Sequence, residues 1–425
     1  MKLFKNINTF RAFRSRNYVL YFTGQGTSLI GTWMQRTAVS WVVYSMTHST
    51  FMLGLTVFAS QFPSFLFSLI GGIVSDRYNR YKVLLFTQIA SMVQAVLLAL
   101  LAFTNQYTVW EILTLSTILG VINAFDVPAR QPLVHEIIYD KEDLPNALAL
   151  NSSIVNIARL IGPALSGIIL EKFGAGVCFI LNGASFLAVI ISLLLMRLPA
   201  YVPKLVKKKV MADLVEGFTY IRRTPTIGVV MLMLTLVSLF VLPYNTLLPV
   251  FAKIIFKGNA TTFGYINSFI GLGAVAGTLF LASLKPGTNL KIILLVNTII
   301  FGIGLILFSR ISYFPLAMLF AVICGFGTMS QSTICNTIIQ VEGAAHMRGR
   351  VMSFIAMALF GMLPIGSLII GIISQKIGAP NAIFCQGIMA IIIALIFFKF
   401  LRNDNINRKE IDDLEAIGDT TLEEI

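Results

Sequence analysis

The chain has 425 residues, of which 56% are hydrophobic and only 12% are charged. A soluble domain carries about 25% charged residues, so this composition excludes a water-surrounded globular protein, and it equally excludes a disordered chain. The four cysteines lie singly in apolar runs, which excludes a disulfide scaffold or a cysteine metal site. The net charge is +13, and its meaning depends on where the basic residues lie along the chain.

Twelve apolar stretches, each long enough to cross a bilayer as a helix, follow one another along the sequence. A hydrocarbon core about 30 Å thick needs roughly 20 helical residues, and uninterrupted apolar runs of that length are too long for spanning strands. The predicted spans cover residues 17–44, 51–74, 82–103, 110–131, 146–170, 176–197, 226–251, 261–283, 291–309, 314–338, 351–374 and 380–401. We therefore predict an all-α membrane protein with twelve transmembrane helices.

Basic residues favour one side of this arrangement. With a cytoplasmic N-terminus, 25 of the 32 Lys and Arg residues fall in cytoplasmic segments and 5 fall in outer loops. The positive-inside rule then places both termini in the cytoplasm. Residues 1–16 resemble a signal peptide, but further spans follow them, so we interpret them as a basic, uncleaved cytoplasmic N-terminus.

The longest interior break, residues 198–225, divides the spans six and six. Its basic residues 207–209 and amphipathic residues 211–223 predict a cytoplasmic interdomain loop with a helix lying on anionic lipid headgroups. A pattern also repeats at an offset of 204 residues: Lys172, Gly174, Ala175 and Gly183 match Lys376, Gly378, Ala379 and Gly387. We expect two pseudo-symmetric six-helix bundles, 17–197 and 226–401, that rock about a midplane site, and a mobile, acidic cytoplasmic tail at 402–425.

A glycine and three charged residues follow the second span at fixed spacing: Gly72, Asp76, Arg77 and Arg80. The orientation rule explains the arginines, but it does not explain Asp76, a carboxylate at the membrane edge that costs desolvation unless it is paired. The pattern resembles the major facilitator superfamily, whose signature between spans two and three is G-x-x-x-D-R-x-x-[RK], although Asn79 replaces a usual glycine. The resemblance implies that superfamily's fold of two six-helix bundles.

The resemblance also implies a conformational gate. In that superfamily the aspartate meets the N-terminus of the eleventh helix in the outward-open state, where the helix dipole favours a negative charge, and here the partner would lie near residues 350–353. The arginine at the Arg80 position joins a charge relay with an acid at the inner end of the fourth span, for which Asp126 is the candidate. Alternatively, Asp126 pairs with Arg130 one helical turn away, and the two pairings are not exclusive.

The fifth span contains Gly162, Pro163 and Gly167. These residues resemble the antiporter motif G-x-x-x-G-P-x-x-G-G of superfamily exporters, although Ala158 and Ser166 stand where glycine is typical. Small residues and a proline create a smooth face for a neighbouring helix, which any tightly packed span could use. The match therefore favours export without requiring it.

Two arginines, Arg36 and Arg159, lie within spans, where a guanidinium costs at least about 3 kcal/mol unless it faces water or a partner. Each lies on a polar helical stripe, with Gln25 and Thr32 in the first span and Asn156 in the fifth. We interpret these five residues as binding an anionic or strongly polar substrate group. The alternative is an arginine that is satisfied by carbonyls or snorkels to an interface.

The tenth span adds the polar residues Gln331 and Asn336, which we assign to the same substrate site or, alternatively, to helix packing. Asp126 is the one acid placed well inside a span, so either it is the proton site or the chain has none. His135 and Glu136 lack the second histidine of a zinc protease motif, and the sequence predicts no metal site and no catalytic group.

The likeness is greatest to the drug–proton antiporter and enterobactin exporter branch of the superfamily, in residues 31–36, 76–77, 159–163 and 348–353. It implies a secondary active transporter in the bacterial inner membrane that exports a small amphipathic or anionic molecule, such as a drug or siderophore, by proton antiport and alternating access. We expect the proton motive force to replace any cofactor, and we expect a monomer in the lipid bilayer with no nucleic acid partner.

Two other functions stay open at this point. The missing antiporter glycines favour a proton-coupled importer of a nutrient or lysolipid. A membrane-embedded enzyme or a sensor is disfavoured because no nucleophile and base pair in the spans. An ATP-driven pump is excluded on this chain because it has no Walker lysine motif.

Overall fold

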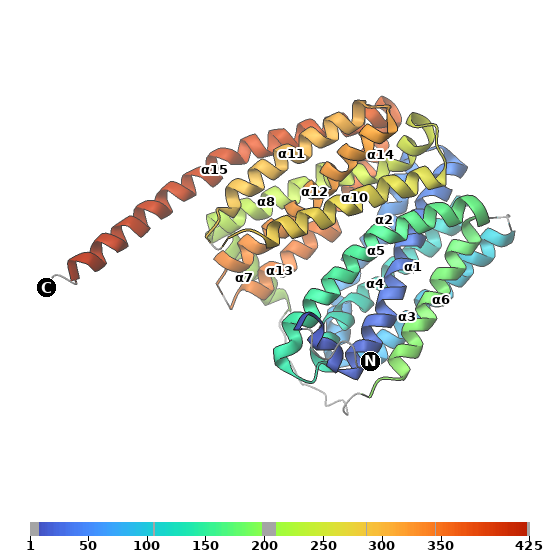
Figure 1. Cartoon of the computed structure of the whole chain (residues 1–425), viewed down its shortest axis with the longest axis horizontal. Coiled ribbons are helices and arrows are strands. Elements are labelled where there is room, and N and C mark those ends of the chain that lie inside the picture. The colour runs from blue at the N-terminus through green and yellow to red at the C-terminus, as the bar shows by residue number, and fades with distance from the viewer. Residues whose placement is uncertain (1–7, 105–106, 198–209, 286, 345, 423–425) are drawn as a thin grey trace.

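The structure is a computed structural model that describes residues 8–104, 107–197, 210–285, 287–344 and 346–422 (Figure 1). Every regular element in these ranges is helical. The first half contains η2 (Asn8–Arg14), α1 (Arg16–Thr47), α2 (Thr50–Arg77), α3 (Arg80–Thr104), α4 (Val109–Ile137), η3 (Lys141–Asp143), α5 (Leu144–Phe173) and α6 (Ala175–Leu194). The second half contains α7 (Val210–Arg223), α8 (Pro225–Phe240), η4 (Leu242–Leu247), α9 (Leu248–Val250), η5 (Phe251–Ile255), α10 (Ala260–Ala282), α11 (Leu290–Arg310), α12 (Phe314–Glu342), α13 (Arg348–Met357), η6 (Ala358–Met362), α14 (Leu363–Ile377) and α15 (Ala379–Leu422).

All twelve predicted spans are helical, and two of them are irregular. The seventh runs through α8, η4, α9 and η5, and the eleventh runs through α13, η6 and α14. Both η5 and η6 are π-helical turns, and prolines at the starts of η4, α9 and α14 remove backbone donors there.

Eleven of the described helical segments are long and apolar enough to cross a membrane. α1 is not among them, although its 32 residues exceed the length that a crossing needs. Polar residues such as Gln25, Thr32 and Arg36 make it less apolar than the other spans. It packs against α5 and α6 and takes the place of the predicted first span (Figure 1).

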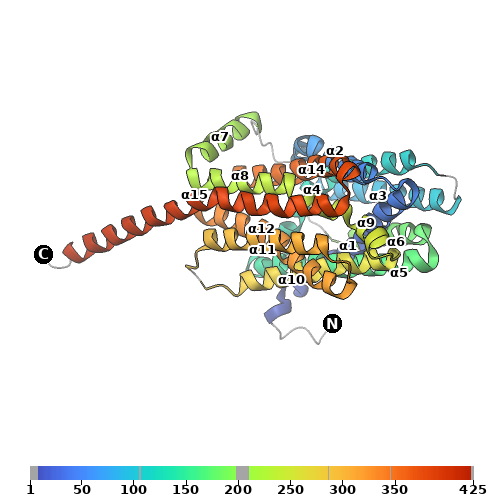
Figure 2. The same cartoon turned by 90° about the horizontal axis from the view of Figure 1, so that it is seen from above.

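The helices gather in two groups, α1–α6 and α8–α15, that lie side by side (Figures 1 and 2). The predicted repeat has the same local geometry in both. Gly174 joins α5 to α6 and Gly378 joins α14 to α15, each with φ of 83°, a left-handed value that favours glycine. Gly183 packs on Val96 of α3, and Gly387 packs on Gly302 of α11. These equivalent contacts support an internal duplication.

The interdomain segment includes the expected helix, α7, whereas residues 198–209, with the basic residues 207–209, lie outside the described part. The Arg350 guanidinium on α13 pairs with Asp213 at 2.7 Å and with Glu216 at 2.5 Å, so one face of α7 docks on the second half. Val215 and Phe218 stay exposed on α7. The acidic face of α7 therefore binds protein, while the contact of its exposed apolar residues with lipid stays a prediction.

The end of the chain is helical. α15 continues without a break to Leu422 and extends beyond the other helices (Figure 1), while the mobility of the tail from residue 402 stays a prediction. The sequence after Pro380 has no proline, so nothing there removes a backbone donor and stops the helix.

Candidate substrate cavity and gates

A cavity of about 1030 Å³ lies between the two groups of helices. The wall from the first half combines apolar side chains with many polar ones. The polar ones are Gln25, Ser28, Thr32 and Arg36 of α1, Ser60, Gln61, Ser64 and Ser68 of α2, Gln88 and Ser91 of α3, and Asn123, Arg130 and Gln131 of α4. The second half contributes a smaller wall: Asp213 and Leu214 of α7, His346, Gly349, Arg350, Ser353, Ala356 and Met357 in and before α13, and Phe360 of η6. Polar side chains of this number suit a hydrated or polar ligand.

The cavity reaches one end of the molecule, which we call the gate end. Gly72, Asp76 and Arg77 at the close of α2 line it there, opposite Gly349 and Arg350 at the start of α13. The other end, where α2 and α10 begin, is called the far end.

The two groups of helices close on each other toward the far end. The Thr50 hydroxyl of α2 donates to the Gly371 carbonyl of α14 at 2.9 Å. The Thr261 hydroxyl of α10 donates to the Gly167 carbonyl of α5 at 3.2 Å. The described structure is therefore open at the gate end and closed at the far end.

Arg36 and Arg159 share one aromatic ring. Their guanidinium carbons lie 4.9 and 5.2 Å from the centroid of Trp33, within cation–π range. Arg159 also donates to the Met329 sulfur at 3.2 Å. Within the described ranges neither arginine forms an ion pair with a carboxylate, so neither positive charge is neutralised by an acid there.

The predicted substrate residues separate into three groups. Gln25, Thr32 and Arg36 line the cavity. Asn156, Arg159 and Asn336 do not line it, yet each has a buried polar atom without a hydrogen-bond partner among the described residues. Gln25 Oε1 is likewise buried without a hydrogen-bond partner among the described residues. Buried polar atoms are normally paired with protein or water, so these atoms mark places where a polar ligand or water would be stabilised.

Gln331 lies elsewhere. It is fully buried and accepts hydrogen bonds from Thr298 at 2.7 Å and Asn297 at 3.5 Å, both on α11. These bonds place its oxygen in the contact between α11 and α12, which fits the packing alternative. Its Nε2 is a further buried atom without a hydrogen-bond partner among the described residues, so its place in the substrate site stays a prediction.

The gate residues form two ion-pair clusters in place of the single predicted relay. Arg80 lies 3.5 Å from Asp76 and 2.6 Å from Glu136. Asp126 pairs with Arg130 and accepts from Thr87 at 2.9 Å.

Arg80 therefore meets an acid of the fourth span as expected, but that acid is Glu136. The sequence pattern around His135 and Glu136 gives no sign of this role. The position of each acid along the helix axis decides which one reaches Arg80. Glu136 is in the last turn of α4, level with the start of α3, whereas Asp126 lies ten residues further from that end, about 15 Å along the helix.

Asp126 itself is 1% exposed, and it accepts a further hydrogen bond from Gln88 at 2.7 Å. Gln88 and Arg130 both line the cavity. The alternative pairing of Asp126 with Arg130 is the one observed, and it places a buried carboxylate one side chain away from the cavity.

The second half carries a matching ion pair. Lys291 at the start of α11 lies 3.2 Å from Glu342 at the end of α12, as Arg80 at the start of α3 meets Glu136 at the end of α4. The loop after the eighth span lacks the Asp-Arg pair of the first half, but this ion pair retains the link between the third and fourth helices of its bundle.

The antiporter-like residues of α5 lie in helix contacts. A Cβ at Gly162 would fall 2.6 Å from the Trp33 Cβ, and one at Gly167 would fall 2.7 Å from the Ala260 carbonyl oxygen. A Cβ at Gly264 would meet the Pro163 carbonyl oxygen at 2.5 Å. Gly167 and Pro163 thus form the far-end contact with α10, whereas Gly162 packs inside the first half.

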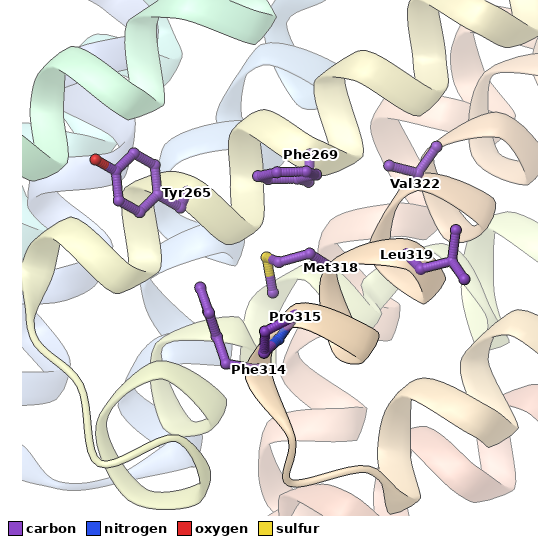
Figure 3. A pocket seen from close by; sticks show the side chains of 7 residues that line it. All are labelled: Tyr265, Phe269, Phe314, Pro315, Met318, Leu319 and Val322. Carbon is purple, nitrogen blue, oxygen red and sulfur yellow. The ribbon is translucent and has the colours of Figure 1, made fainter.

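A second hollow, of about 500 Å³, lies between α10 and α12 (Figure 3). Its lining is almost wholly apolar: Tyr265, Phe269, Phe314, Pro315, Met318, Leu319 and Val322. It offers no charge to a polar substrate. No group of three potential ligands of the His, Cys, Asp or Glu type could hold a metal ion within the described ranges.

The sequence model of one protein family, described as transmembrane secretion effector, matches residues 7–422. The chain belongs to this family of the major facilitator superfamily. Its relatives include the staphyloferrin A transporter of Staphylococcus aureus, which is 26% identical over 92% of this chain and 98% of that protein. The enterobactin exporter EntS of Salmonella typhi is 25% identical over 81% of each chain, and macrolide efflux protein A of Streptococcus pyogenes is 21% identical over 88% of this chain and 93% of its own.

Solved structures support the same fold. The chain is similar to a bacterial homologue of the human lysosomal transporter Spinster, in an inward-facing, unoccupied conformation, with a TM-score of 0.73 at 14% identity over 92% of this chain and 98% of that chain. A POT family transporter bound to 5-aminolevulinic acid gives the same TM-score and identity over 92% of this chain and 96% of its own.

Membership confirms several predictions. The chain is a multi-pass bacterial membrane protein with the major facilitator fold, it is a secondary transporter of the efflux type for a small molecule, and it is not an enzyme. The importer and enzyme alternatives are therefore set aside.

Proposed function

We propose that this transporter exports an anionic small molecule from the cytoplasm and that protons move in the opposite direction. The observation that supports an anionic substrate is the pair of arginines, with Arg36 in the cavity wall and Arg159 on the same Trp33 ring, neither of them neutralised by a carboxylate among the described residues. A guanidinium presents several donors in a plane that matches a carboxylate, which favours such a group over a cation.

The orientation in the membrane follows from the placement of charge. Basic residues gather at the gate end, so we infer that this end faces the cytoplasm and that both chain termini lie there. In that orientation the described conformation would face inward, ready to accept a substrate from the cytoplasm. The relatives named as exporters support the same direction.

Asp126 is our candidate for the proton site. It is buried, it is connected to the cavity through Gln88 and Arg130, and its ionised form is stabilised by the Arg130 ion pair. An inward-facing carboxylate in this state would have released its proton to the cytoplasm, which fits a cycle in which the proton enters from outside and substrate leaves.

Uptake into inverted membrane vesicles tests the substrate class. The probes are staphyloferrin A, enterobactin and a macrolide, the compounds for which the relatives are named. We expect uptake of an acidic probe, and we expect Arg36→Ala or Arg159→Ala to raise its KM by about 10- to 100-fold, because a charged hydrogen bond contributes about 1.5–3 kcal/mol.

Arg310→Ala is the matched control. The Arg310 guanidinium lies 4.2 Å from the Phe384 ring at the far end and is outside the cavity lining, so its loss should leave the KM unchanged. Equal effects of all three substitutions, or preferred transport of a cationic probe, would contradict the anionic site.

A further inference from the structure

The two bundles present two helix pairs with matching geometry, one at each end of the molecule. At the gate end α2 finishes at Arg77 where α13 begins at Arg348. At the far end α5 finishes at Phe173 where α10 begins at Ala260. In each pair the C-terminal end of a first-half helix faces the N-terminal end of a second-half helix.

Each first-half helix also carries one acid in its last turn. Asp76 is next to the final residue of α2, and Glu171 is two residues before the end of α5. The first N–H groups of a helix have no partner within that helix and attract negative charge. Both acids are therefore placed where they can bind the helix start on the other bundle.

The far-end contact is made in this conformation. Glu171 Oε2 accepts a hydrogen bond from the Ala260 backbone N–H at 3.3 Å, while Asn259, the N-cap, accepts from the Thr262 N–H at 3.1 Å. Ala260 is 3% exposed because α5 covers it. At the gate end Asp76 and Arg350 line the cavity, and Arg350 is bound by Asp213 on α7.

We propose that Glu171 is the far-end latch of the transport cycle, the counterpart of Asp76 at the gate end. It binds the start of α10 when the far end is closed and loses that partner when the bundles separate there. The two acids thus stabilise opposite conformations, and substrate export requires each bond to break in turn. This inference rests on the alternating-access part of the proposed function, and it does not depend on which substrate is carried.

The test measures the outward-open population directly. Thr32 lines the cavity, which is closed at the far end, so a cysteine placed there reacts with a membrane-impermeant maleimide from outside only when the far end opens. Thr32→Cys is combined with Cys385→Ser, since Cys385 is the exposed one of four native cysteines. Labelling rates are measured in intact cells and in inverted vesicles without substrate.

We expect Glu171→Gln to raise the outside labelling rate about two- to fivefold, the contribution of one charge at a helix N-terminus, and Glu171→Ala to raise it at least as much. Asp76→Asn should lower the outside rate. Glu111→Gln is the matched control, because Glu111 is also a far-end acid but caps its own helix, accepting from the Thr108 N–H at 2.6 Å. It should leave both rates unchanged.

A Glu171→Gln rate equal to that of Glu111→Gln would overturn the latch. A rise in the inside rate along with the outside rate would also overturn it, because general loosening of the fold predicts that result. The proposed function fails separately: if labelling shifts as expected but vesicles take up none of the probes, the latch stands and the export proposal falls.

Discussion

The contact between Gly167 and α10 gives a quantitative prediction about the conformational balance. In Gly167→Ala the new Cβ would lie 2.7 Å from the Ala260 carbonyl oxygen, 3.0 Å from the Thr261 Cα and 3.1 Å from the Gly264 Cα. Ordinary contacts of this kind are about 3.5–4.0 Å, so the two backbones have to move apart. Overpacking of a close interface costs about 1–3 kcal/mol.

That cost falls only on the conformation that is closed at the far end. We therefore expect Gly167→Ala to raise the ratio of outward-open to inward-open molecules by about 5- to 100-fold, since about 1.4 kcal/mol corresponds to a factor of ten. Gly72→Ala is the mirror experiment. A Cβ at Gly72 meets nothing within 4 Å in this conformation, but the gate-end contact implied by the superfamily would crowd it.

Spin labels report the two ends separately. Thr104 on α3 and Tyr313 before α12 are exposed at the far end, and Tyr139 and Val341 are exposed at the gate end. In Gly167→Ala the distance distribution between labels at Thr104 and Tyr313 should shift to longer values, and that between labels at Tyr139 and Val341 to shorter ones. Gly72→Ala should not lengthen the first distance.

Both substitutions replace a helical glycine with alanine and therefore gain similar helix propensity in every conformation. A matched shift of both variants in the same direction would refute the steric reasoning. So would unchanged distances in Gly167→Ala.

Two further substitutions test the assignments of individual side chains. Gln331→Leu should lower stability by no more than about 0.5–1.5 kcal/mol, the net contribution of one hydrogen bond, because the Thr298 hydroxyl keeps the Leu294 carbonyl as an acceptor. It should leave the substrate KM unchanged, and a higher KM at equal stability would return Gln331 to the substrate site. Asp213→Asn should weaken the ion pair between α7 and Arg350 and so raise the rate at which trypsin cleaves at Arg222. The control is Glu142→Gln, and equal cleavage rates in the two variants would contradict the docking of α7.

Local sequence signals predicted the helices and their turns well. Hydropathy places a helix over each predicted span, and the repeated glycines at positions 174 and 378 adopt the same left-handed turn, because such a conformation is a property of a single residue. The irregular seventh and eleventh spans were missed, since hydropathy does not respond to a π-helical turn.

The site was less predictable because it depends on how helices are rotated and how deep each residue lies. Gln331 and Thr32 are both polar residues in spans, yet one faces α11 and the other faces the cavity. A hydropathy profile does not distinguish a polar residue that faces another helix from one that faces the cavity. Glu136 could have been chosen over Asp126 as the partner of Arg80 by counting helical rise from the ends of α3 and α4.

Proton coupling is the central claim, and pH-gradient flux in proteoliposomes tests it most directly. Purified protein is reconstituted with a probe that the vesicle assay has shown to be carried, and lumenal pH and probe flux are recorded together. We predict that probe and protons move in opposite directions, that an imposed pH gradient drives probe accumulation, and that Asp126→Asn abolishes this accumulation while downhill probe flux persists. Probe flux that ignores the pH gradient, or that carries protons in the same direction, would contradict the account.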